Sequence, residues 1–102
     1  MASAGGDVKT ATITVPSGTT KGILIVVIAG WASQYNSYTL NGNGILTKKT
    51  IESDANGVVN NSVLSTKFEV DECTLTPGGK ITMTFSTTNY ERYPSFRMFL
   101  IY

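Results

Sequence analysis

The sequence predicts an all-β fold: a single β-sandwich domain of jelly-roll-like type with seven or eight short antiparallel strands. In several segments β-branched and apolar residues alternate with polar residues, which is the period of two typical of strands with one buried face. Glycine or proline interrupts this pattern roughly every ten residues, as in chains built from short strands and tight turns. No segment of useful length shows the period of an amphipathic helix.

The first half of the chain begins with small residues at positions 1–7, which we expect to form a flexible N-terminal arm before a sandwich domain over 8–102. Alternation over residues 8–15 predicts a strand with one solvated face, ended by Pro16, which has no backbone donor. Gly18 permits the positive φ that a tight turn requires.

Residues 23–29 are apolar on both faces, which predicts a strand at the centre of a sheet with Trp31 at its end. A short strand over 38–40 and an Asn-Gly-Asn-Gly turn follow. Residues 45–51 predict an edge strand, because Lys48 and Lys49 are the kind of charges that protect an exposed edge.

The second half contains turn signals at 54–57 and 77–79, one or two strands within 58–70, and strands over 81–85 and 96–102. Its core candidates are Val63, Phe68 and Val70, and Ile81, Met83 and Phe85 alternate with Thr82, Thr84 and Ser86. The last strand is largely apolar on both faces. It is therefore either central in its sheet or covered on its outer face by another subunit, so we expect self-association.

The composition limits the partners of the protein. With 102 residues the chain is one domain, 41% hydrophobic and only 15% charged. A net charge of +1 gives no electrostatic attraction to nucleic acid or to an anionic membrane, and we expect neither as a partner. The apolar run over 22–32 is too short to span a bilayer and lies too far from the start to be a signal peptide, so a soluble protein made in the cytoplasm is expected.

The absence of histidine argues against enzymatic activity, since it excludes serine triads, Cys-His pairs and the ordinary zinc sites. Carboxylate pairs suited to a glycosidase remain, but we expect them to be solvated acids in turns or at strand ends. These candidates are Glu52 with Asp54, Glu69 with Asp71 and Glu72, and Glu91.

No metal or cofactor is expected either. Asp54, Asn56 and Gly57 have the spacing at the start of a calcium loop, and Glu69, Asp71 and Glu72 add further oxygen ligands, but no acidic ligand follows at the twelfth position of the loop. The single cysteine, Cys73, cannot form an internal disulfide, and its acidic neighbours favour a buried or inert thiol.

Two groups of aromatic and polar residues in predicted loops are the candidate binding site. The first group is Trp31, Gln34, Tyr35, Asn36 and Tyr38, and the second is Tyr90, Arg92, Tyr93 and Phe96. Flat rings beside amide or guanidinium donors suit stacking on a sugar face and also anchor protein interfaces. Trp31 and Tyr38 have the alternative of capping the core. The candidate partner- or glycan-binding residues are Trp31, Tyr35, Asn36, Tyr90, Arg92 and Tyr93.

Four segments carry a resemblance to a known class of proteins: ITVPSGTTKGILIVVIAGW, YTLNGNGI, LTPGGKITMTF and SFRMFLIY. From about residue 8 onward, this pattern resembles small β-sandwich (jelly-roll-like) domains of tailed-bacteriophage virion proteins, which occur in capsid decoration proteins and at the tips of head and tail fibres. The resemblance supplies no catalytic residues to carry over.

The resemblance implies a non-enzymatic structural protein of the virion, made in the host cytoplasm. Only seven residues precede the domain and no stalk is present, which favours a capsid decoration (cement) protein that binds the outer shell through apolar and hydrogen-bonded surface. The alternative is a receptor- or carbohydrate-binding tip domain of a tail or head fibre. The expected partners are the major capsid protein or a fibre, further copies of the chain (a trimer is favoured), and a host surface glycan.

Overall fold

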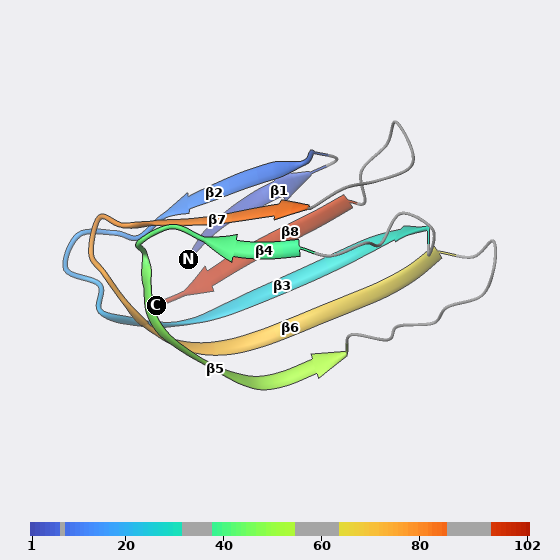
Figure 1. The fold of residues 1–102 in the computed structure, drawn as a ribbon. Helices are drawn as coiled ribbons and strands as arrows, with labels where there is room; N and C mark the ends of the chain where they lie inside the picture. Colours follow the sequence, from blue (N-terminus) through green and yellow to red (C-terminus); the bar gives the residue numbers. More distant parts are fainter. Residues whose placement is uncertain (7, 32–37, 55–63, 86–94) are drawn as a thin grey trace.

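The computed structural model describes residues 1–6, 8–31, 38–54, 64–85 and 95–102, without the side chains of residues 29–31, 54, 64–67 and 85. These residues form eight β-strands and no helix. All strand pairs are antiparallel and form two sheets that pack face to face (Figure 1). The predicted all-β sandwich is therefore confirmed.

The larger sheet has five strands. Their order is β1 (Ala2–Gly6), β8 (Ser95–Ile101), β3 (Lys21–Trp31), β6 (Leu64–Leu75) and β5 (Ile45–Asp54). The strand that is apolar on both faces, β3, lies at the centre as predicted. The last strand, β8, lies between β1 and β3, so the first of its two interpretations is confirmed.

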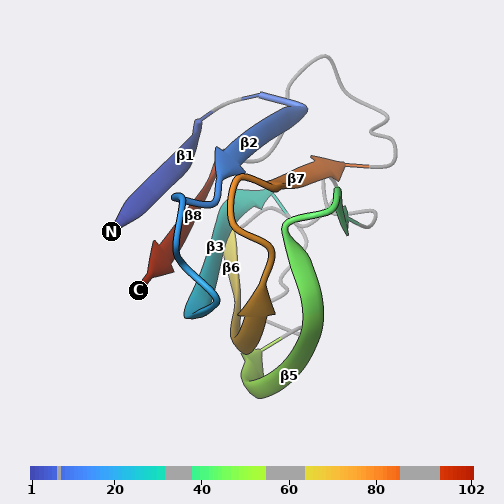
Figure 2. The same cartoon turned by 90° about the vertical axis from the view of Figure 1, so that its left-hand side faces the viewer.

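The smaller sheet has three strands in the order β2 (Thr10–Thr14), β7 (Lys80–Phe85) and β4 (Tyr38–Asn41). It covers one face of the larger sheet, as the perpendicular view shows (Figure 2). Its outward positions carry threonines that pair across the strands, with the Thr12 and Thr82 hydroxyl oxygens 2.9 Å apart.

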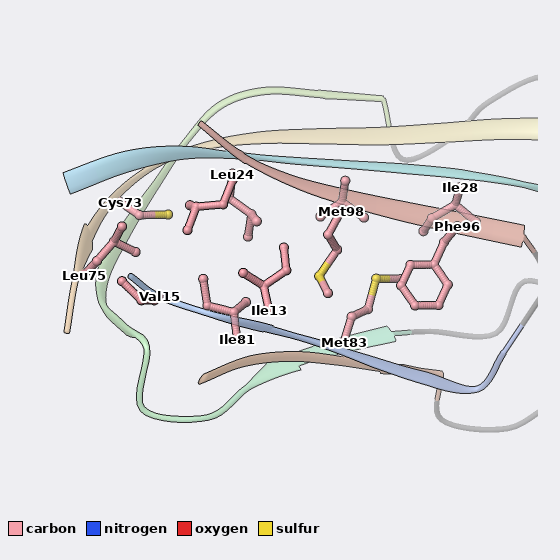
Figure 3. Packing of buried hydrophobic residues seen from close by; sticks show 12 residues of the cluster. Ile13, Val15, Leu24, Ile28, Cys73, Leu75, Ile81, Met83, Phe96 and Met98 are labelled. Carbon is pink, nitrogen blue, oxygen red and sulfur yellow. The ribbon is translucent and has the colours of Figure 1, made fainter. Parts of the chain in front are cut away.

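The core lies between the two sheets, and side chains from both point into one layer (Figure 3). Every core residue is at most 3% exposed. The members are Ile13, Val15, Leu24, Val26, Ile28, Cys73, Leu75, Ile81, Met83, Phe96, Met98 and Leu100. The alternation that predicted β2 and β7 thus gives the correct inward face for Ile13, Ile81 and Met83.

The N-terminal segment differs from the expected flexible arm, because Ala2–Gly6 forms strand β1 at the edge of the larger sheet. Its small residues give no strand signal, yet they allow the backbone to lie close to β8. Gly5 has φ of +153°, and a Cβ at this position would collide with the carbonyl oxygen of Phe96. The pairing therefore depends on glycine rather than on strand propensity.

The edge strand β5 and the turn before it follow the sequence prediction. In that turn Gly42 has φ of +100°, and a Cβ there would meet the Lys80 carbonyl oxygen. β5 is the outermost strand of the larger sheet, and irregular register at Ile45/Thr47 and Thr50/Glu52 interrupts its pairing with β6. The irregular register and the exposed Lys49 protect this edge from pairing with other chains, whereas Lys48 points inward and pairs with Glu69.

Two core candidates were wrong and others lie outside the described part. Phe68 and Val70 are only half-buried, because they occupy the outward positions of β6. Residues 55–57 of the predicted turn and Val63 lie outside the described residues, as does the side chain of Phe85.

Candidate functional site

The structure describes none of the six predicted partner-binding side chains. Trp31 is the last residue of β3, but its side chain lies outside the described part, as do Tyr35, Asn36, Tyr90, Arg92 and Tyr93. The attachment points of the two segments are described. Residues 32–37 connect Trp31 to Tyr38, and residues 86–94 connect Phe85 to Ser95.

These attachment points lie at one end of the sandwich. Tyr38 pairs with Phe85, so the residue that follows segment 32–37 and the residue that precedes segment 86–94 are adjacent in the smaller sheet. In the larger sheet, Ser95 pairs with Ala29, two positions before Trp31. The described residues that flank the two segments, Trp31, Tyr38, Phe85 and Ser95, therefore lie at the same end of the domain.

The outer face of the larger sheet is the first feature with functional chemistry. We use this term for the outward positions of β3, β6 and β8. Their apolar members are Ile23, Ile25, Val27, Phe68, Val70, Phe99 and Ile101, and their charged members include Glu72 and Arg97. Val27 is 36% exposed and Ile101 44% exposed, while Ile25 is half-buried. The smaller sheet covers the opposite side, so no second layer among the described residues packs on these apolar side chains.

A groove of about 530 Å³ borders this face. Its lining residues are Lys21, Gly22, Ile23, Thr47, Lys48, Lys49, Glu72, Cys73 and Thr74. Glu72 is the one carboxyl group among them, so the groove holds no pair of acids for general acid–base chemistry.

The second feature is a group of polar side chains on the inward side of β5 and β6, here called the inner cluster. It consists of Tyr38 from β4, Lys48 and Thr50 from β5, and Glu69 and Asp71 from β6. Strand alternation places Glu69 and Asp71 on the same face as the buried Cys73 and Leu75. Asp71 is completely buried, with 0% exposure.

Hydrogen bonds and ion pairs connect the whole cluster. The Tyr38 hydroxyl donates to Glu69 Oε1 at 2.7 Å, and Lys48 Nζ donates to Glu69 Oε2 at 3.1 Å. Thr50 Oγ1 donates to Asp71 Oδ1 at 2.7 Å. The second oxygen, Asp71 Oδ2, lies 3.8 Å from Lys48 Nζ and has no hydrogen-bond partner among the described residues.

The two carboxyl groups of the cluster have opposite pKa shifts. Burial and the adjacent Glu69 carboxyl group together raise the pKa of Asp71 to about 6, against the opposing effects of the Thr50 hydrogen bond and the Lys48 charge. For Glu69, burial acts to raise the pKa, but interactions with Asp71, Tyr38 and Lys48 outweigh it and lower the pKa. Glu69 is thus the ionised member of the pair, and Asp71 is the member that retains a proton more readily.

The neighbouring groups respond to the same charges. Burial and the hydrogen bond to Glu69 raise the pKa of the Tyr38 hydroxyl. Burial opposes the charge of Lys48, but the Glu69 carboxylate raises the pKa of this amine overall. The predicted burial of Cys73 is confirmed, and burial raises the pKa of its thiol to about 11.

The expectation that Glu69 and Asp71 are solvated acids at a turn or strand end was wrong. Both lie within β6, and their inward position follows from the alternation that also points Cys73 and Leu75 inward. Glu69, Asp71, Cys73 and Leu75 occupy every second position of the strand, and this spacing was the sequence signal that would have found the cluster. Glu52 and Glu72 are exposed, whereas Glu91 and the side chain of Asp54 lie outside the described residues.

The cluster has the chemistry of proton transfer, but one of its two carboxyl groups cannot reach a substrate. A glycosidase needs two carboxyl groups that reach a sugar in a cleft, and Asp71 has no exposed surface. Within the described residues, no group of three or more His, Cys, Asp or Glu side chains is arranged to hold a metal ion. The predicted calcium-loop residues Asn56 and Gly57 lie outside that part.

Comparison with known proteins gives no relative to assist the assignment. No family model, curated protein or solved structure matches this chain. Over the described ranges, no helix is long and apolar enough to cross a membrane.

Proposed function

We propose that this chain is a non-enzymatic structural protein of a tailed-phage virion, a capsid decoration (cement) protein that binds the shell through the outer face of its larger sheet. The observation that supports docking is the row of partly exposed apolar side chains on that face, among them Val27 and Ile101. The assignment to a virion rests on the sequence resemblance described above.

The chemistry of the outer face suits a protein partner. Its centre, on β3 and β8, is aliphatic and aromatic, with Arg97 as the charged exception. Its margins carry exposed polar residues, including Ser3 on β1 and Lys49 on β5. An apolar centre with a polar rim is typical of protein interfaces, and its affinity depends little on salt.

A matched pair of variants tests this proposal. Val27→Glu places a carboxylate opposite Arg97 on the outer face, and Thr14→Glu places one opposite Lys80 on the smaller sheet. Each new carboxylate has a cationic neighbour across the strands, so both variants should fold. We expect the wild type and Thr14→Glu to co-sediment with undecorated capsid shells of the phage that encodes the chain, also at about 0.5 M salt, while Val27→Glu stays in the supernatant.

Two results of this experiment contradict the proposal. Wild-type protein that leaves the shells at high salt is held by charges rather than by the apolar face. Equal binding of the two variants places the contact elsewhere. Light scattering of the wild type tests the expected trimer. If the wild type forms an oligomer in solution and Val27→Glu is a monomer, the outer face binds a second copy of the chain instead of the shell.

The second candidate function is a receptor- or carbohydrate-binding tip domain of a fibre. It is supported by the common end of the sandwich at which the described neighbours of the two segments, Tyr38, Phe85 and Ser95, lie. In this case a glycan array gives a signal with the wild type, and replacing Tyr90 and Tyr93 by alanine abolishes it without loss of the fold. An array without signal rejects the glycan function.

A further inference from the structure

We propose that Lys48 and Asp71 become joined by an intramolecular amide bond between Lys48 Nζ and Asp71 Cγ, which the inner cluster forms without an enzyme. The amine and the carboxyl group lie next to each other, with Lys48 Nζ 3.8 Å from Asp71 Oδ2. This oxygen is fully buried and without a hydrogen-bond partner among the described residues, so nothing there separates it from the amine. The fold has thus brought a nucleophile and an electrophile together before any reaction.

Each neighbour of the pair has a role that the condensation requires. Glu69 Oε2 accepts a hydrogen bond from the Lys48 ammonium at 3.1 Å, so this oxygen is positioned to take a proton from the amine. Thr50 donates to Asp71 Oδ1 at 2.7 Å, where negative charge develops when the amine attacks Cγ. Tyr38 holds Glu69 from the other oxygen at 2.7 Å and is therefore a positioning residue.

The reaction balances without any co-reactant. The Lys48 ammonium first passes a proton to the Glu69 carboxylate, which leaves a neutral amine and a neutral acid. The amine attacks Cγ of protonated Asp71, and the new oxyanion forms on Oδ1 beside the Thr50 hydroxyl. Glu69 returns a proton to Oδ2, the Cγ–Oδ2 bond breaks, and water leaves. The nitrogen then releases its remaining extra proton to Glu69, so that an ammonium and a carboxylic acid become an amide, one water and one proton.

The surroundings favour the product over the charged reactants. Asp71 has 0% exposure and the Glu69 side chain 15%, so the Asp71 carboxyl group is poorly hydrated. A buried carboxyl group that lacks a partner for one oxygen is costly, and an amide removes that group and the lysine charge together. The bond ties the edge strand β5 covalently to β6, next to the irregular register at Thr50/Glu52.

Intact mass measurement of the whole, denatured chain tests this proposal. We expect the wild type to be lighter than its sequence mass by one water, about 18 Da. Lys48→Arg should have its full sequence mass, because a guanidinium is a poor nucleophile, yet its charge preserves the ion pair and the fold. Glu69→Gln should also have the full mass, because it removes the proton acceptor.

The neighbouring lysine provides the control. Lys49→Arg, which changes the adjacent outward position of β5, should lose water as completely as the wild type. A wild-type chain of full sequence mass overturns the proposal. So does a water loss that persists in Lys48→Arg, since cyclisation of an aspartate elsewhere in the chain removes the same mass without needing this amine.

Discussion

Strands β3 and β6 are neighbours in one sheet and turn the same face toward the core, yet at two successive inward pairs they carry opposite kinds of side chain. The inward residues of β3 include Leu24 and Val26, both with 0% exposure. Their partners on β6 are Asp71, opposite Leu24, and Glu69, opposite Val26. The inward face of this sheet therefore carries apolar side chains on β3 and carboxyl groups on the adjacent strand β6.

The difference follows from what each strand meets. Leu24 and Met98 face Ile13 and Ile81 of the smaller sheet, which fills the space with apolar atoms (Figure 3). β6 instead adjoins the edge strand β5, whose Lys48 and Thr50 supply a cation and a hydroxyl donor. The apolar half of the interior, between β3, β8 and the smaller sheet, is stabilised by removal of apolar surface from water. The charged half, which is the inner cluster between β5 and β6, depends on specific hydrogen bonds and ion pairs.

The largest effect is expected in the apolar half. Leu24→Ala should lower the free energy of unfolding by about 3 to 5 kcal/mol, because it leaves a cavity in a fully packed layer. Ile25→Ala on the outer face of the same strand should cost less, roughly 1 to 2 kcal/mol, since this side chain is only half-buried. Urea denaturation of both variants measures the difference. Equal losses would mean that the outer face is as closely packed as the core.

In the charged half, loss of the amide bond should be nearly as costly. Lys48→Arg keeps an ion pair with Glu69 but opens the loop closed between residues 48 and 71, which should lower the free energy of unfolding by roughly 3 kcal/mol. Lys49→Arg should leave it unchanged. Urea denaturation compares the two. A Lys48→Arg chain as stable as the wild type would show that pairing alone holds this half together.

The pH dependence of stability sharpens the same contrast. In Lys48→Arg the carboxyl group of Asp71 remains titratable among Glu69, Cys73, Tyr38 and the introduced guanidinium. Burial raises its pKa, which is about 6 in the native cluster, so its stabilising effect is complete below the unfolded pKa and is lost as pH rises through the folded one. The free energy of unfolding of Lys48→Arg should therefore decrease as the pH rises through about 6.

The wild type, with Asp71 in an amide, should lack that decline. Glu69 has a lowered pKa, so its own contribution disappears only as pH falls, in both proteins. Denaturant midpoints between about pH 4 and pH 7 measure both profiles. Identical profiles would indicate that Asp71 is the same chemical group in the two proteins.

The smallest effect concerns Cys73, which lies where the two halves meet. Burial raises the pKa of its thiol to about 11, so we expect negligible reaction with a disulfide reagent in the folded protein at pH 7 and rapid reaction in urea. Rapid labelling of the native chain would show that the Cys73 thiol becomes accessible to solvent in the folded protein.

The sequence pattern was sufficient for the strands whose residues alternate or are apolar throughout. The threonine-isoleucine alternation found β2 and β7, and the apolar run found β3 as the central strand. β1 was missed because alanine, serine and glycine have little strand propensity, and its pairing depends on close backbone approach at Gly5.

The inner cluster was missed for a different reason. Carboxylates are usually solvated, so residue type argued for exposure of Glu69 and Asp71, while the period of two argued for burial beside Cys73 and Leu75. Periodicity gave the correct answer here. Sequence alone does not contain the pairing of β5 with β6, which is what brings Lys48 and Thr50 to these acids.

The most direct test of the charged half is a tryptic peptide map of the denatured wild-type chain. If the bond is present, trypsin does not cleave after Lys48, and residues 22–49 should elute linked to residues 68–80 with the summed mass minus one water. Fragmentation should place the link between Lys48 and Asp71. Recovery of 22–48 and 68–80 as separate, unmodified peptides would contradict the account, and the inner cluster would then be an ion-paired network only.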